Sequence, residues 1–453
     1  MHDLALVGFI LSLIALGTQK PFIFVLGYAY VDIVSPQRLS YYLLNSIPVS
    51  LIFFVLAVGG YLAVDDKTGT RLSGRQVLLI LLLLWCGYTT FTADFPAAAL
   101  EKWDWVWKAL VFAIFLPFTL RTRLRIEGLL LFMVVSASSI IIVGGVKTLL
   151  GGGGYGTLNL GLSDNSGLYE GSTISTVAIA IIPTILFLAR YGTIFPRSWM
   201  VRLYSLALVF ACLLIPIGTA TRTGLICIGL VAIMGLRDSK RRILYMGAMA
   251  VAVMVAVPFL PQTYTARMHT IQGYQSDESA STRVAVWGWT WNYVQDHPAG
   301  GGFAAYLGNH IVLNLKDARG QPINNAVEYD KARAFHSAYF EMLGEQGFPG
   351  FGLWALLHLT SLFRLELLRR RFRRAAGESE QWIAPLATAL QHGHIIYLVG
   401  SLFIGIAFQP FVYMMIACEI GLDSYVRRTR PETPRVAMGG GPQQPAARRA
   451  LPA

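Results

Sequence analysis

Charged residues are scarce in this sequence. Only 14% of its 453 residues are Asp, Glu, Lys or Arg, against roughly 25% in an ordinary soluble domain. A soluble protein of this length would need more polar surface than these residues supply. The mean hydropathy is +0.53, and apolar runs of about 20 residues, the length that crosses a bilayer, recur along the chain. The composition therefore excludes a soluble globular protein and predicts a polytopic membrane protein.

The apolar runs are continuous rather than alternating, which favours helices over the strands of a barrel. We predict an all-α integral membrane protein with about 12 to 13 transmembrane helices and one long exoplasmic loop, 261–337, that contains short helices. The first run lacks a basic flank and a small-residue cleavage site, so no cleavable signal peptide is expected. The predicted spans are 3–18, 20–35, 44–64, 76–93, 104–120, 126–150, 172–190, 200–219, 223–236, 243–260, 338–363, 385–405 and 408–426.

Cysteines and metal-binding motifs are also rare. The only cysteines, Cys86, Cys212, Cys227 and Cys418, lie in apolar spans without C-x-x-C pairing, which excludes a disulfide framework. The run Gly151–Gly154 is not followed by Gly-Lys-Ser/Thr, so it is no phosphate-binding loop. The exoplasmic loops hold no D-x-D and no His/Asp/Glu group at metal-ligand spacing. We expect neither a metal nor a cofactor.

Lysine and arginine are unevenly distributed, because strongly basic connectors alternate with nearly neutral ones from residue 65 onward. By the positive-inside rule, the basic connectors are cytoplasmic, and 94–103, 151–171, 219–222 and 261–337 are exoplasmic. The formal net charge of +12 thus reflects topology and contact with anionic membrane lipids, and we expect no nucleic-acid partner. The basic set is Lys67, Arg71, Arg75, Arg121, Arg123, Arg125, Arg190, Arg197, Arg202, Arg237, Lys240, Arg241, Arg242, Arg364 to Arg374, Arg427, Arg428 and Arg430.

Several cations nevertheless lie on the predicted exoplasmic side, where topology does not require them. His336 opens a membrane helix there, and Arg222 occupies a short turn between two spans. Arginine holds phosphate through a planar, permanently charged fork, and a histidine among arginines stays neutral and can accept a proton. The group predicts a site for an anionic ligand, whereas each arginine alone is equally explained as a headgroup anchor. The loop cations beside His336 are Arg267, Arg283, Lys331 and Arg333.

One amphipathic helix is predicted inside the long loop, because Val284, Trp287, Trp291 and Val294 recur at a spacing of three to four residues. This helix is either a lid over an exoplasmic cavity or an ordinary packed loop helix.

Other polar residues allow weaker interpretations. Asn165, with Asp164 and Glu170, either contacts sugar hydroxyls or forms a solvated turn. Glu341 and Glu345 lie four apart on the helix after His336 and pair with loop arginines or with Lys147. His392 and His394 are interpreted as structural.

The motif His336-Ser337, nine residues, then Gly347-Phe348-Pro349-Gly350 resembles the H-[NSQ]-x9-G-x-x-G signature of O-antigen ligases. Thr221-Arg222-Thr223-Gly224, Arg283-x3-Trp287 and His297-Pro298 with Gly301-Gly302-Phe303 are also similar to the O-antigen ligase and polymerase superfamily. Lys20-Pro21-Phe22 and Ser35-Pro36-Gln37-Arg38-Leu39 resemble a subgroup, the O-glycosylation ligases associated with the exosortase A system. The resemblance divides the chain into an N-terminal transmembrane region of the subgroup type (1–125), a ligase-like transmembrane domain (126–426) and a disordered cytoplasmic tail (427–453), rich in Pro, Gly and Ala.

This resemblance implies a multi-pass glycosyltransferase of the bacterial inner membrane with its active site facing the periplasm. The donor would be a glycan on undecaprenyl diphosphate, and the acceptor a hydroxyl of a protein or of lipid A-core. His336 would activate the acceptor, while Arg222 and Arg283 would neutralise the diphosphate without a metal. The remaining substrate-binding candidates are Arg267, Lys331, Arg333, Ser337 and Asn165.

Two alternatives remain open. A polysaccharide polymerase would join lipid-linked repeat units by the same chemistry, and a transporter or flippase would move them. The sequence shows no internal symmetry and no paired broken helices, which disfavours transport.

Overall fold

The computed structural model describes residues 2–151, 167–237, 241–244, 246–247, 251, 254, 278–316, 322–375, 377 and 379–429. Two candidate site residues, Asn165 and Arg267, lie outside the described residues, as do most of the predicted span 243–260 and the predicted tail from residue 430 onward.

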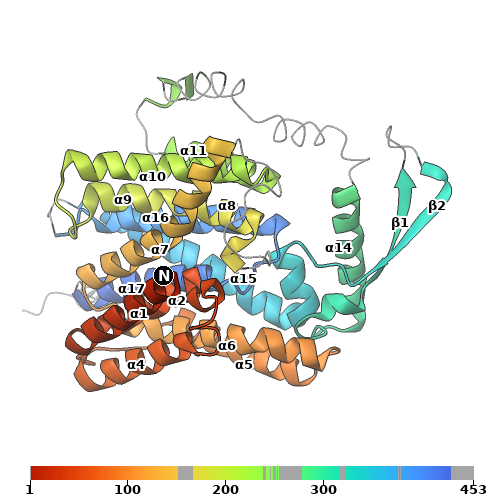
Figure 1. Ribbon diagram of the computed structural model, residues 1–453, viewed down its shortest axis with the longest axis horizontal. Helices are drawn as coiled ribbons and strands as arrows, with labels where there is room; N and C mark the ends of the chain where they lie inside the picture. The colour runs from red at the N-terminus through yellow and green to blue at the C-terminus, as the bar shows by residue number, and fades with distance from the viewer. Residues whose placement is uncertain are drawn as a thin grey trace, which may run out of the picture.

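The described chain is a bundle of roughly parallel and antiparallel helices with one small hairpin at its edge (Figure 1). The N-terminal half comprises α1 (His2–Gln19), α2 (Phe22–Val34), α3 (Pro36–Leu39), α4 (Val49–Val64), α5 (Gly74–Phe91), α6 (Pro96–Thr119), α7 (Arg123–Gly151), η1 (Gly167–Tyr169), α8 (Gly171–Ala180) and α9 (Ile182–Tyr191). The remainder comprises α10 (Trp199–Gly218), α11 (Arg222–Gly235), α14 (Glu278–Asp296), η3 (Ala305–Gly308), β1 (His310–Lys316), β2 (Pro322–Lys331), α15 (Ala338–Phe372), α16 (Ile383–Gly400), η4 (Ser401–Phe403) and α17 (Pro410–Thr429).

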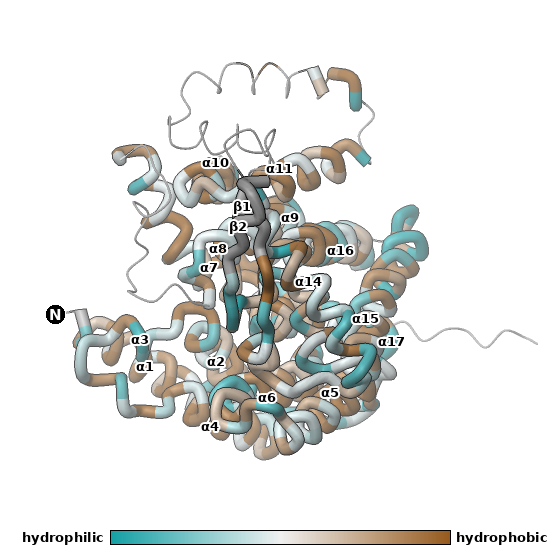
Figure 2. Tube along the Cα trace, turned by 90° about the vertical axis from the view of Figure 1, so that its right-hand side faces the viewer, coloured by the Kyte–Doolittle hydropathy of each residue, from teal (hydrophilic) through white to brown (hydrophobic). Residues whose placement is uncertain are grey.

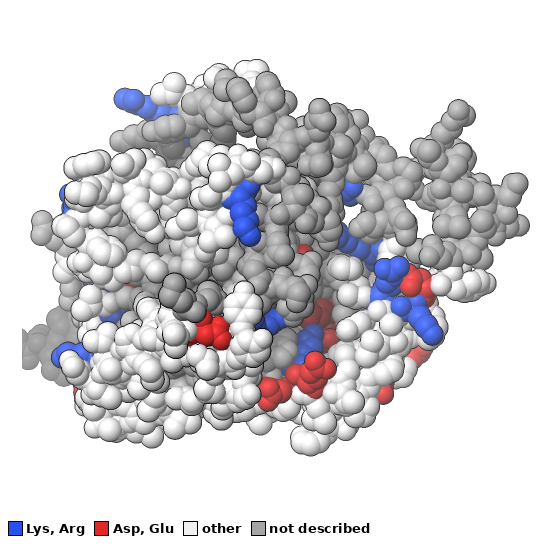
Figure 3. Space-filling model, viewed as in Figure 1, with Lys and Arg blue, Asp and Glu red and all other residues white. Residues whose placement is uncertain are grey.

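The helices confirm the prediction of an all-α integral membrane protein. Within the described residues, a helix covers every predicted span except 243–260. Five are long and apolar enough to cross a membrane: α5, α7, α8 with α9, α10 and α15. Four shorter helices, α1, α2, α4 and α11, are also apolar. The space-filling view shows how few charged side chains the flanks of the bundle expose (Figure 3).

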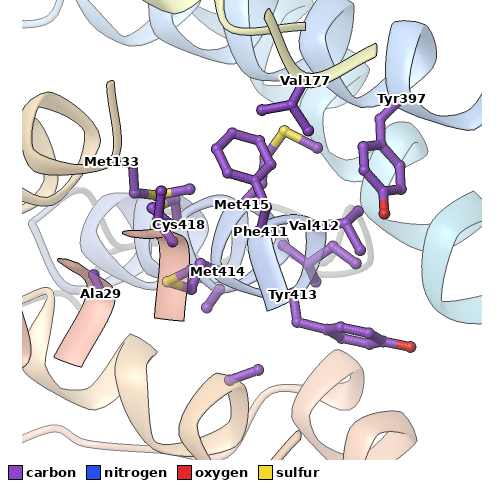
Figure 4. Close-up of a cluster of buried hydrophobic side chains, with 14 of the residues drawn as sticks. Ala29, Met133, Val177, Tyr397, Phe411, Val412, Tyr413, Met414, Met415 and Cys418 are labelled. Carbon is purple, nitrogen blue, oxygen red and sulfur yellow. The ribbon is translucent and has the colours of Figure 1, made fainter. Parts of the chain in front are cut away.

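Helix α17 forms the centre of the bundle. Every residue from Phe411 to Asp423 is buried, and an apolar helix buried all round lies inside a bundle rather than against lipid. Figure 4 shows Phe411 and Met415 on one side of α17, near Val177, and Met414 on another side. By contrast, α10 exposes Leu203, Leu206 and Phe210, as expected of a lipid-facing helix.

Two predicted spans differ from simple helices. The span 172–190 is broken at Ile181 into α8 and α9, because Pro183 starts the second segment and cannot donate a helical hydrogen bond. The span 338–363 extends to Phe372 and contains a kink at Gly347, whose φ is 61° and ψ is −167°.

The long loop holds more regular structure than predicted. It contains the 19-residue helix α14 and an antiparallel hairpin in which His310 pairs with Lys331 and Val312 with Tyr329. The predicted short helices therefore account for only part of this loop. Figure 1 and Figure 2 show the hairpin at the end of the bundle that carries α14.

Helix α14 confirms the predicted loop helix, and its predicted apolar stripe is partly buried, since Val294 is fully buried and Trp287 is half-buried. Val284 is 65% exposed and Trp291 is 52% exposed, whereas Val286, Thr290 and Val294 are fully buried. The buried face is therefore rotated relative to the predicted stripe, and Trp291 lies at its edge with its ring against that of Phe348.

Candidate active site

His336 lies just before α15, in a short segment fixed on both sides. Phe335 and Ser337 are buried, 3% and 1% exposed, whereas His336 is exposed and adopts the left-handed conformation with φ 49°. The indole Nε1 of Trp287 donates to the carbonyl oxygen of Phe335 at 2.8 Å. Phe335 also packs with Val286 of α14 in a small apolar cluster. The segment is thus anchored to α14, and its histidine is turned outward.

Three charged groups determine the electrostatics of His336. Partial burial lowers the pKa of its imidazole, and the positive charge of Arg283 lowers it further. Glu170 raises this pKa, and Arg333 lowers it. The result is a pKa below the ordinary value of 6.5, so the imidazole is neutral near pH 7. A neutral imidazole has one nitrogen free to accept a proton, as a general base requires.

The turn before Arg222 contacts the start of α8, next to Glu170. Thr219 and Thr221 hydrogen-bond through their hydroxyls to Ser175 of α8, at 2.8 and 3.1 Å. Glu170 caps α8 by accepting from the Thr173 backbone N–H at 2.6 Å. Arg222 is the first residue of α11 and is half-buried. Glu170 is therefore close to both the Arg222 turn and His336, although these belong to segments more than a hundred residues apart.

Arg333 is held both by its backbone and by its side chain. The backbone of Arg333 is bound by Asn309, whose side chain donates to its carbonyl at 2.6 Å and accepts from its N–H at 3.0 Å. The Arg333 guanidinium is paired with Asp330, which offsets its charge. Lys331 is exposed at the end of β2. Asn309, fully buried, was missed by sequence reasoning, because an isolated asparagine in a loop carries no pattern.

The glycine motif after His336 is explained by a close backbone contact. Gly347 lies against the 298–300 turn, and a Cβ at Gly347 would overlap Pro298 and Gly300. The N–H of Phe348 donates to the Pro298 carbonyl at 3.0 Å, and the N–H of Gly301 donates to the Gly344 carbonyl at 3.0 Å. This contact joins the end of α14 to α15 and so fixes Arg283 relative to His336.

A buried ion cluster lies below His336 in α15. Lys102 of α6 donates to Glu341 at 2.6 Å and to Glu345 at 2.8 Å. The predicted partners, the loop arginines or Lys147, were therefore wrong. Glu345 also accepts from the Ala304 N–H, and Glu341 from the Ala407 N–H, both at 3.0 Å. The pairing of Lys102 with these glutamates was not predicted, because a lysine near the end of a membrane span is ordinarily interpreted as an anchor to lipid headgroups.

The two interior histidines interpreted as structural are indeed buried, at 8% exposed for His392 and 0% for His394. His394 joins two neighbouring helices, contacting His358 of α15 at 2.6 Å and Glu419 of α17 at 2.8 Å.

The arrangement provides a proton acceptor and permanent cations on one face of the bundle. His336, Arg283 and Arg333 share one electrostatic environment, and the turn that carries Arg222 is connected to it through α8. Such a group can take a proton from a hydroxyl and stabilise an anionic leaving group.

Two family models match separate parts of the chain. Residues 1–193 match a family of unknown function (DUF5935), and residues 206–355 match the O-antigen ligase family. No curated protein matches the chain. The second match contains Arg222, Arg283 and His336, and it supports an enzyme of the O-antigen ligase and polymerase type with lipid-linked glycan substrates. The part of the chain that carries the candidate active site therefore resembles an O-antigen ligase domain, within a multi-pass membrane protein.

Proposed function

We propose that the protein transfers a glycan from undecaprenyl diphosphate to an acceptor hydroxyl on the periplasmic face of the inner membrane. The observation that carries the proposal is the position of His336, with a lowered pKa beside Arg283, at the start of α15 in the ligase domain. The acceptor is a protein side chain or a lipid A-core sugar. The resemblance of Lys20-Pro21-Phe22 and 35–39 to exosortase-associated ligases favours the protein.

In the proposed reaction, His336 accepts the proton of the acceptor hydroxyl while the hydroxyl oxygen attacks the anomeric carbon of the donor. The bond between that carbon and the diphosphate oxygen breaks, and undecaprenyl diphosphate leaves with the bonding electrons. Attack opposite the leaving group inverts the anomeric centre. Arg222 and Arg283 neutralise the diphosphate through permanent charges, a task that needs no metal. Arg333 and Lys331 contact the substrate at the edge of the site, with Arg267 and Asn165 proposed to join them.

The test is transfer from a lipid diphosphate glycan by the purified protein in liposomes. His336→Ala is expected to reduce transfer by about 100-fold or more, the range of general base catalysis. The control is His310→Ala, since His310 is an exposed histidine in the same loop whose ring Nδ1 lies 3.0 Å from the Gly308 carbonyl oxygen in its own turn. Undiminished transfer by His336→Ala would remove the base from the mechanism.

The product separates ligase from polymerase. A ligase moves the glycan to a protein or lipid A-core, while a polymerase yields longer glycans still attached to undecaprenyl diphosphate. Deleting the gene and identifying which molecule loses its glycan decides between the acceptors.

A further inference from the structure

A cavity of about 1110 Å³ lies at the opposite end of the bundle from His336. It is lined by the start of α7, the end of α9, the start of α10 and the residues just before α16. The charge pattern predicts this end to be cytoplasmic. The cavity is as large as many ligand-binding pockets. Its polar lining comprises Arg123, Arg190, Thr193, Arg197, Arg202, Ser205, Gln381 and Trp382.

Most of these arginines are not neutralised by acidic residues. Arg123 pairs with Glu127 at 2.6 Å. Within the part of the chain that the structure describes, no ion pair joins Arg190, Arg197 or Arg202 to a carboxylate. Other arginine clusters at the same end do surround a carboxylate: Arg75, Arg364 and Arg427 contact Asp423, and Arg237, Arg369 and Arg370 contact Glu366.

The positive-inside rule explains why these connectors contain arginine, but it does not explain why the start of α7 and the segment 190–202 both direct arginines at one cavity. The guanidinium of Arg123 lies over the Trp382 ring, 4.7 Å from its centroid, and Trp382 is 2% exposed. The buried Trp382 ring and the Arg123 guanidinium stacked on it therefore form one fixed wall of the cavity. Three cations without a carboxylate partner around one open cavity repel one another, so a bound anion lowers their electrostatic energy.

The apolar lining identifies the source of that anion. Leu186 and Leu206 line the same cavity and are 47% and 61% exposed. They continue the lipid-facing surface of α9 and α10. A ligand whose phosphate lies among the arginines and whose acyl chains lie along these leucines would fit both the basic and the apolar parts of the lining. We propose that this cavity binds the phosphate headgroup of an anionic membrane phospholipid.

The test uses the full chain in nanodiscs of phosphatidylcholine with increasing fractions of phosphatidylglycerol, and it measures the thermal unfolding midpoint. A lipid that binds only the folded state raises this midpoint with its concentration. The test variant is Arg190→Gln/Arg197→Gln/Arg202→Gln. The control is Arg71→Gln/Arg371→Gln/Arg374→Gln, which removes three exposed positive charges at the same end, outside the cavity.

We expect the cavity variant to need at least about tenfold more phosphatidylglycerol for the same rise, since each arginine near a membrane surface contributes to anionic-lipid binding. The control variant should behave as the wild type. Inorganic phosphate in pure phosphatidylcholine discs should leave the midpoint unchanged.

Equal losses in the two variants would overturn the proposal in favour of diffuse surface charge. A full rise with inorganic phosphate alone would overturn it in favour of a free-anion site. If the triple variant does not fold, Arg202→Gln alone, exposed in the first turn of α10, is expected to shift the titration in the same direction, and no shift would count against the site.

Discussion

At the scale of single residues, the site depends on backbone positions that side-chain chemistry alone does not reveal. His336 has a positive φ of 49°, a conformation that costs about 1–3 kcal/mol for most residues and is found where the surroundings impose it. Here the surroundings are the buried neighbours Phe335 and Ser337. The histidine and its basic neighbours were predicted from sequence, because a cation on the exoplasmic side breaks the charge pattern. Asn309 was not predicted, and Glu170 was predicted only as part of a loop, since the roles of both residues depend on contacts with segments distant in sequence.

The pH dependence of transfer tests the charge environment of His336. Its pKa is lowered from 6.5 by burial first and by Arg283 second, and the neutral form is the active one. The acid limb of kcat/KM, the fall of rate as pH decreases, should therefore have its midpoint below pH 6.5. Arg283→Gln should raise this midpoint by removing a cation, and Glu170→Gln should lower it by removing an anion.

The midpoint, rather than the maximal rate, is the quantity to compare, because Arg283 is also proposed to bind the donor. If neither substitution shifted the midpoint of the acid limb, His336 would not be the titrating base.

At the scale of elements, the sequence predicted where helices lie better than how they bend or which face they bury. Continuous apolar runs mark the spans of α7 and α10 directly. The break at Ile181 has a local cause, Pro183. The kink at Gly347 instead depends on a segment distant in sequence, the 298–300 turn, which packs against it. The hairpin of β1 and β2 was missed because short alternating strands give a weak signal beside long apolar helices.

Substitution of Gly347 tests the contact between the 298–300 turn and α15. Gly347→Ala places a Cβ against Pro298 and demands a φ of 61° with ψ near 180°, which only glycine adopts readily. We expect a loss of about 1–3 kcal/mol in stability and a fall in transfer, measured by thermal unfolding and by the liposome assay. The control is Gly352→Ala, since Gly352 is exposed five residues further along α15, with open space at its Cβ.

Because alanine favours helix over glycine, Gly352→Ala should be neutral or slightly stabilising. Equal behaviour of the two variants would show that the kink does not position the site.

At the scale of the whole molecule, the two ends of the bundle differ in how they use arginine. At the end of α15 that bears His336, cations surround a histidine, and at the opposite end they surround either carboxylates or the cavity of α7, α9, α10 and α16. The sequence predicted this polarity from the alternation of connectors. It did not predict which cations are neutralised, because Asp423, for example, meets Arg75 from a helix 348 residues away.

The buried ion cluster of Lys102, Glu341 and Glu345 joins the two matched regions of the chain. Lys102 of α6 lies in the N-terminal match, whereas Glu341 and Glu345 of α15 lie in the ligase match. Lys102→Met leaves Glu341 and Glu345 buried, at 6% and 0% exposed, without their cation. Breaking a buried ion pair in this way costs about 3–5 kcal/mol. We expect a large drop in the thermal unfolding midpoint in nanodiscs. The control is Lys108→Met on the same helix, whose partner Asp104 is 70% exposed, so its loss should cost about 1 kcal/mol or less.

A rescue variant separates charge from packing. In Lys102→Met/Glu341→Gln/Glu345→Gln, the amide oxygens can still accept from the N–H groups of Ala407 and Ala304, while no buried charge remains. Recovery of most of the lost stability would attribute the defect to the uncompensated carboxylates. A triple variant as unstable as Lys102→Met would instead mean that the lysine side chain acts by its packing against Phe303 and Phe408, whose ring centroids lie 5.5 and 5.6 Å from its Nζ.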